Sequence, residues 1–178
     1  MQKKKTSKNA AKKRSQGSLK QSTHTPDKQP ILVPVDFSAH SQAALEYAAD
    51  LAQCLRLPIA VLHVVHDPGD APGYYHLKGR KQQLLRLEDI ASEMLNEFMD
   101  KMVKQHSKYT VLKKAERLLV TGLPVTRILE VADRLEPKML VMGSAGRTGL
   151  SHFLLGSKAE QLLRMCPYPV TIVKLPED

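Results

Sequence analysis

The chain has 178 residues, of which 42% are hydrophobic and 25% charged, and its formal net charge is +9; this length suits one domain of about 150 residues with a flanking segment. It contains no run of about 18 or more apolar residues, which excludes a transmembrane helix, and its charged beginning lacks the apolar stretch of a secretory signal. The two cysteines, Cys54 and Cys166, form no disulfide framework, so we expect reduced thiols in the core of a cytoplasmic protein.

The positive charge is concentrated at the beginning of the chain. Residues 1–30 carry nine Lys or Arg and one acid, whereas the other 148 residues carry 18 Lys or Arg and 17 Asp or Glu. Residues 1–29 contain almost no large apolar side chain, so we expect a disordered basic tail followed by a domain over residues 30–176. Such a tail can bind nucleic acid or another anionic surface by counterion release, but a solvated tail is the favoured interpretation.

The domain is expected to open with a buried strand and a helix. Residues 31–35 are almost continuously apolar, as strands covered on both faces are, and Pro34 should mark the end of the strand because proline donates no hydrogen bond. Apolar residues then recur at helical spacing through residues 44–55, with Ser38 or Ser41 as the N-cap.

The rest of the chain repeats this alternation. We expect strands at residues 59–65, 116–120, 139–142 and 170–173, and helices at residues 77–106, 124–135 and 157–165. Alternating strands and helices predict an α/β fold, Rossmann-like, with a single five-stranded parallel sheet and helices on both faces. Ligands bind such sheets where the order of strands reverses, so Asp36 and Gly143, which end the first and fourth strands, would form one crevice if these strands were neighbours.

The stretch from residue 142 to 157 carries the strongest functional signal. Gly143, Gly146 and Gly156 lie where a strand leads into a helix, and their lack of a Cβ atom lets the backbone take positive φ and approach a ligand closely. Ser157 is expected to cap the last helix, whose free N–H groups and partial positive charge favour an anion. The pattern predicts a phosphate-binding loop.

Other kinds of site do not fit the spacing. The order Gly156-Ser157-Lys158 differs from the Gly-Lys-Ser/Thr order of a Walker loop. His63 and His66 lie three residues apart on a strand and so point to opposite faces, which is wrong for a shared metal, and His63 is expected in the core or the pocket wall. The sequence also lacks a zinc-spaced Cys/His cluster and a nucleophile elbow.

Several motifs together resemble the universal stress protein family, in its ATP-binding, UspA-like branch. They are Pro-Val-Asp-Phe-Ser at 34–38, Leu-His-Val at 62–64, Gly-x-Pro at 122–124, Val-Met-Gly-Ser-x-Gly-Arg at 141–147, Leu-Leu-Gly-Ser at 154–157 and Cys-Pro-x-Pro-Val at 166–170. The resemblance covers nearly all of residues 30–174. It implies the strand order 3-2-1-4-5, ATP in the crevice between strands one and four, and a cytoplasmic homodimer formed through the fifth strand, Val170 to Val173.

The resemblance also implies which residues bind the nucleotide. They are Pro34, Val35, Asp36, Val64, Met142, Gly143, Gly146, Gly156, Ser157, Lys158 and Ala159. Asp36 would accept hydrogen bonds from the ribose, and Gly146 with residues 156–159 would hold the phosphates. AMP or ADP is an alternative to ATP, with or without Mg²⁺. Lys158 is unusual for the family at its position, and we hypothesise that Lys158 or Arg147 contacts the γ-phosphate.

Three functions follow from these patterns. The first is a stress-response regulator whose shape or partners depend on bound ATP. The second is a slow ATPase or autophosphorylating enzyme using the same site, although the loop hydroxyls have no evident carboxylate partner and phosphoryl transfer needs a positioned base and a metal clamp. The third is nucleic-acid binding by the tail, which predicts a steep dependence on salt.

Overall fold

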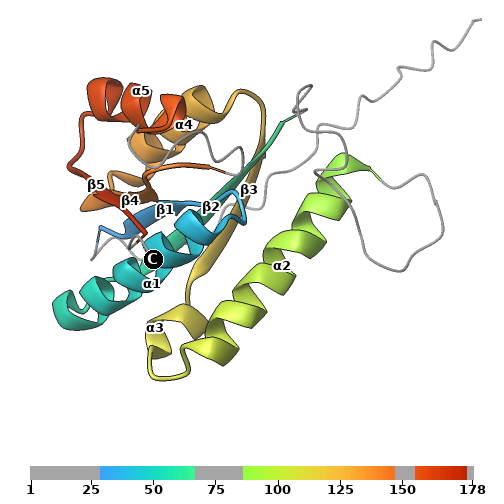
Figure 1. The fold of residues 1–178 in the computed structure, drawn as a ribbon, viewed down its shortest axis with the longest axis vertical. Helices are drawn as coiled ribbons and strands as arrows, with labels where there is room; N and C mark the ends of the chain where they lie inside the picture. The colour runs from blue at the N-terminus through green and yellow to red at the C-terminus, as the bar shows by residue number, and fades with distance from the viewer. Residues whose placement is uncertain (1–28, 67–85, 147–154, 176–178) are drawn as a thin grey trace, which may run out of the picture.

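The computed structural model describes residues 29–66, 86–146 and 155–175, and within these ranges five strands alternate with helices (Figure 1). The strands are β1 (Ile31–Pro34), β2 (Ile59–Val65), β3 (Glu116–Thr121), β4 (Met139–Gly143) and β5 (Val170–Val173). The helices are α1 (Ala39–Leu55), α2 (Leu87–Gln105), α3 (Thr110–Lys113), α4 (Pro124–Leu135) and α5 (Ser157–Met165). The expected basic tail lies outside these ranges, except for its residue 29.

The strands form one parallel sheet in the order β3-β2-β1-β4-β5, which confirms the predicted fold class. Ile31 of β1 pairs with Ile59 of β2 on one side and with Met139 of β4 on the other, so β1 is central. The chain adds β2 and β3 on one side of β1 and then β4 and β5 on the other. The order of strands therefore reverses between β1 and β4, where ligands bind in this class of sheet.

Each face of the sheet packs against its own set of helices (Figure 1). Because side chains alternate along a strand, neighbouring residues of β1 enter different cores. Val33 packs against α1, α2 and α3, whereas Leu32 packs against α4 and α5, and both side chains are fully buried. The two cores hold β1 and β4 from both faces, which fixes the edge where these strands end.

The first helix begins at the predicted cap. The Ser38 hydroxyl accepts a hydrogen bond from the Ser41 amide at 3.2 Å, so Ser38 is the N-cap and Ser41 is not. The helix ends at Leu55, and Arg56 closes it in the left-handed conformation with φ 55°. The helix therefore ends three residues before Pro58.

The described part of α2 begins at Leu87, while the predicted start near residue 77 lies outside the described residues. The four-residue helix α3 was not predicted, because one turn is too short to show helical periodicity. Within the ranges given above, no helix has the length and apolar character needed to cross a membrane.

The expectation that both cysteines are buried is wrong for Cys54. Its thiol is free and the residue is exposed, while Cys166 is free and partly buried. Cys54 follows the buried Ala52 by two positions, which on a helix places it on roughly the opposite side. The thiol at position 54 consequently faces solvent.

Candidate functional site

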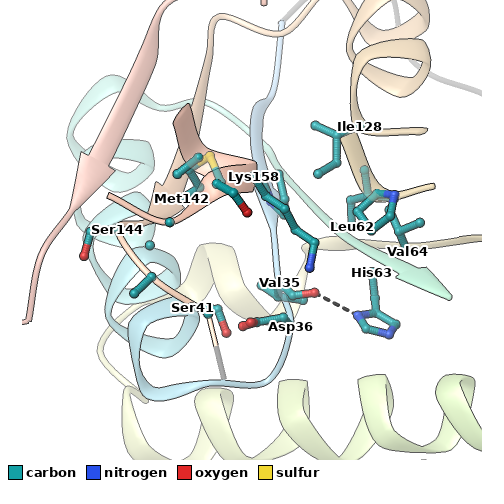
Figure 2. A pocket seen from close by; sticks show the side chains of 18 of the residues that line it. Val35, Asp36, Ser41, Leu62, His63, Val64, Ile128, Met142, Ser144 and Lys158 are labelled. Carbon is teal, nitrogen blue, oxygen red and sulfur yellow. Dashed lines mark hydrogen bonds between the residues drawn. The ribbon is translucent and has the colours of Figure 1, made fainter. Parts of the chain in front are cut away.

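A cavity of about 210 Å³ opens at the carboxyl ends of β1, β2 and β4, beside the N-terminus of α5 (Figure 2). All eleven residues predicted to bind the nucleotide line it: Pro34, Val35, Asp36, Val64, Met142, Gly143, Gly146, Gly156, Ser157, Lys158 and Ala159. The strand reversal between β1 and β4 thus brings together residues that lie more than 100 positions apart in the sequence.

One end of the cavity is apolar and buried. Val35, Val64 and Met142 are each less than 9% exposed, and two buried residues that were not predicted, Leu62 and Ile128, complete this surface. Leu62 lies two residues before Val64 on the same face of β2, so strand alternation gave a signal for it. A flat apolar group fits this end, because it would exchange water for hydrocarbon contacts.

The further lining residues that sequence reasoning missed are mostly polar or small. Besides His63, which was expected in the core or the pocket wall, they are Ser41, His66, Pro124, Ser144 and Ala145. They come from α1, the end of β2, the start of α4 and the segment after β4. Pro124, Ser144 and Ala145 lie within the quoted motifs at 122–124 and 141–147, which gave a signal for them, whereas no motif marks Ser41 and His66.

The Asp36 carboxylate is held in place at the end of β1. Its Oδ1 accepts hydrogen bonds from the Ser38 amide at 3.1 Å and the Ser38 hydroxyl at 2.6 Å. Its Oδ2 lies 2.8 Å from the position that a Cβ atom on Gly146 would occupy. The acid therefore both stabilises the turn into α1 and faces the loop after β4.

The structure shows why side chains are excluded at two glycines of the predicted loop. Gly143, Gly146 and Gly156 do not use the positive φ that glycine permits, and Gly122 is the only described glycine with such a value. A Cβ on Gly143 would lie 2.7 to 2.9 Å from the Cβ, carbonyl carbon and oxygen of His40 on α1. Gly143 thus permits close packing of β4 against α1, and Gly146 leaves room for the carboxylate described above.

The cap of α5 is Gly156 and not Ser157, which is the first residue of the helix. The first intrahelical bond runs from the Glu160 amide to the Gly156 carbonyl at 2.9 Å. The Gly156 amide donates to the Ser144 carbonyl at 2.8 Å, so it is used within the protein. The N–H groups of residues 157–159 precede the first intrahelical donor and so lack helical acceptors. These three amides form the end of the cavity suited to an anion.

Lys158 lies at the mouth of the cavity. The residue is exposed, and Figure 2 shows its side chain extending across the cavity toward Val35 and Asp36. It thus adds an ammonium group to the anion-binding end. The other predicted cation, Arg147, lies outside the described residues.

A buried aromatic cluster supports the β1 side of the cavity. The His63 side chain is 1% exposed, and its Nδ1 lies 2.8 Å from the Val35 carbonyl oxygen, which can only accept, so Nδ1 carries the proton. Burial lowers the pKa of His63 below its ordinary value of 6.5. Phe37 stacks on this ring with 4.3 Å between the ring centroids, and its ring centroid lies 5.5 Å from that of Phe98 on α2.

Phe37 adopts φ 65°, a conformation rare for a bulky residue, which no sequence signal indicated. The stacking contacts compensate for that strain and fix the backbone of Val35 and Asp36. Within the described part of the chain, no group of three or more His, Cys, Asp or Glu side chains is placed to hold a metal ion.

Comparisons with known proteins agree with this geometry. The family model described as the universal stress protein family matches residues 28–174. The universal stress protein MJ0531 of Methanocaldococcus jannaschii is 29% identical over 147 residues, which span 83% of this chain and 82% of that protein.

Solved structures show the same architecture. The universal stress protein UspA from Lactobacillus plantarum superposes with a TM-score of 0.57 at 26% identity, covering 82% of this chain and 97% of that one. A universal stress protein solved in complex with cAMP superposes with a TM-score of 0.56 at 25% identity, covering 83% of this chain and 97% of that one.

Proposed function

The chain belongs to the universal stress protein family, and from this premise we propose that it binds ATP in the cavity between β1 and β4 and acts as a nucleotide-dependent regulator in stress response. One observation carries the proposal. The eleven residues that the family resemblance implies as nucleotide-binding all line one cavity, although they come from three strands, one helix and the segments between them.

The order of groups along the cavity supports a nucleotide. The apolar surface of Val64, Ile128 and Met142 suits adenine, the Asp36 carboxylate suits ribose hydroxyls, and the amides of residues 157–159 suit phosphate. The volume of about 210 Å³ is below the roughly 300–1,000 Å³ of enclosed ligand sites, so the phosphates would extend past the exposed start of α5. A relative of the same fold was solved in complex with cAMP, which also supports a nucleotide as the ligand.

Identification of the resident ligand tests the proposal. We expect denaturation of the purified protein to release ATP, AMP or ADP, detectable by mass, and we expect calorimetry to show tighter binding of ATP than of GTP. Asp36→Asn should weaken ATP binding about 10- to 100-fold because it removes a charged acceptor. Asp133→Asn, on the exposed part of α4, is the matched control. Equal affinity of Asp36→Asn and the wild-type protein would contradict the assigned site.

The same sample separates regulation from catalysis. Release of ADP at a steady rate that Asp36→Asn abolishes would favour the slow ATPase, and phosphate incorporated into the protein would favour autophosphorylation. ATP retained without turnover would favour the regulator. Titration in the presence of Mg²⁺ and of a chelator shows whether the metal accompanies the nucleotide.

We propose that the protein forms a homodimer through β5. This strand lies at the edge of the sheet, paired with β4 on one side. The Leu140 and Ser144 amides donate to the carbonyls of Pro169 and Val173, so the alternate residue Ile172 directs its N–H away from β4. Ile172→Pro should shift a dimer to monomer in analytical ultracentrifugation, whereas Ile172→Val should not. A monomeric wild-type protein would contradict the dimer.

We further propose a cytoplasmic location and a domain of residues 30–176 with a basic tail before it. The two described cysteines are free, which fits a reducing compartment. Deletion of residues 1–29 should leave ATP affinity and the melting temperature unchanged. Loss of a salt-sensitive affinity for nucleic acid on this deletion would instead favour a role for the tail in nucleic-acid binding.

A further inference from the structure

The charged groups that line the cavity come from opposite walls. Among its described lining residues, Lys158 is the only lysine or arginine and Asp36 the only carboxylate. Asp36 ends the β1 wall, and Lys158 belongs to the first turn of α5. Negative charge on a ligand must therefore be neutralised at the α5 wall.

Lys158 stands where its own helix disfavours a cation. It is the second residue of α5, and the partial positive charge of a helix N-terminus repels an ammonium group there. Glu160 does not compensate, because residues two apart on a helix do not face each other, and its carboxylate pairs with Arg164 at 3.1 Å. An anion in the cavity would relieve this repulsion, since it is attracted by both the ammonium group and the helix end.

The ammonium group and the backbone amides are separate kinds of donor. The N–H groups of residues 157–159 are fixed by the helix, whereas the lysine ammonium sits on a flexible four-carbon stem that Figure 2 shows reaching into the cavity. Fixed amides suit one phosphate in one position. A mobile cation can follow further phosphates that extend from the first.

We propose that Lys158 makes the cavity prefer nucleotides with two or three phosphates over nucleoside monophosphates. This inference rests on the proposed nucleotide site. The amides of the first turn of α5 hold one phosphate, and Lys158 neutralises the charge of the phosphates that follow it. Lys158 is thus a specificity-determining residue, and its charge matters more as the number of phosphates increases.

The test is a calorimetric titration of the full chain with adenosine, AMP, ADP and ATP. Lys158→Met removes the charge and keeps the length of the side chain, while Lys158→Arg keeps the charge. Lys113→Met, on the exposed end of α3, is the control for loss of one positive charge elsewhere. Thermal melts verify that each variant is folded, and removal of a cation from the start of α5 should not lower the melting temperature.

We expect Lys158→Met to weaken ATP and ADP binding about tenfold, in line with one charge-assisted hydrogen bond, and to change adenosine and AMP binding less than about twofold. Lys158→Arg and Lys113→Met should keep the wild-type ratio of ATP to AMP affinity. An unchanged ratio in Lys158→Met overturns the inference while the nucleotide site stands. A wild-type protein that binds none of the four ligands overturns the proposed function, and this inference with it.

Discussion

The two walls of the cavity are supported in opposite ways. The β1 wall belongs to the central strand of the sheet, packs on both faces and leads into Phe37, which stacks on His63. The α5 wall is the first turn of a nine-residue helix, where Ser157 and Lys158 are exposed. Residues of the first wall contribute to folding as well as to the site, whereas the exposed Ser157 and Lys158 contribute to the site with little effect on folding. The following predictions test this difference, beginning with the largest effect.

Leu62→Ala should lower the free energy of unfolding by about 3 kcal/mol, since a fully buried leucine is replaced by a smaller side chain that leaves a cavity. Denaturant unfolding measures this change. The control is Leu163→Ala on α5, which is 45% exposed and should cost less than about 1 kcal/mol. Leu62 lies on β2, which pairs with β1, and Leu163 lies further along α5, so equal costs at the two positions would contradict the firmer packing of the sheet side of the cavity.

Two glycines of the same loop should respond differently to alanine. Gly143→Ala should lower the free energy of unfolding by about 1–3 kcal/mol because the new Cβ meets the backbone of His40. Gly146→Ala should cost less stability, about 0.5–1 kcal/mol, for the disturbed hydrogen bonds between Asp36 and Ser38. It should weaken ATP binding at least about tenfold because it displaces the Asp36 carboxylate. Denaturant unfolding and calorimetry on the two variants measure both effects. A larger loss of stability in Gly146→Ala, or a larger loss of ATP affinity in Gly143→Ala, would contradict the roles assigned to these glycines.

A smaller effect should appear as pH dependence. Burial lowers the pKa of His63 below 6.5, so the unfolded chain binds the proton more readily than the folded chain. The stabilisation by neutral His63 is complete above pH 6.5 and is lost as pH falls toward the pKa of the folded state. His63→Gln keeps a hydrogen-bond donor for the Val35 carbonyl but has no imidazole to protonate. The free energy of unfolding of this variant should therefore fall less steeply as pH decreases below 6.5. Because the His63→Gln protein keeps every other residue, the difference between the two stability curves isolates His63, and parallel curves would contradict the prediction.

Local pattern predicted the elements whose ends carry a clear chemical signal. Pro124 begins α4, and α5 and β5 have the predicted bounds, since a proline, a Gly-Ser step and a short apolar run mark them. The N-cap of α5 was predicted one residue too late, because Gly156 and Ser157 are both suitable caps. Only the hydrogen bond from the Glu160 amide to the Gly156 carbonyl decides between them.

The missed features depend on distant neighbours. The need for Gly143 arises from His40, which lies on another element, and the positive φ of Phe37 is held by rings of His63 and Phe98. Neither contact can be predicted from the neighbouring residues in the sequence. The adjacency of β1 and β4 was available in advance only through the resemblance to a family, since local patterns do not order the strands of a sheet.

The central place of β1 has a consequence for measuring occupancy. Its backbone is bonded to β2 and β4, and the amides of Ile31 and Val35 donate to the carbonyls of Pro58 and Leu62. Amides enclosed in this way exchange hydrogen with solvent chiefly when the whole domain unfolds. Any ligand that binds only the folded chain slows such exchange by the factor 1 + [L]/Kd. The exchange rate of these two amides would therefore report how fully the cavity is filled, without a label on the ligand.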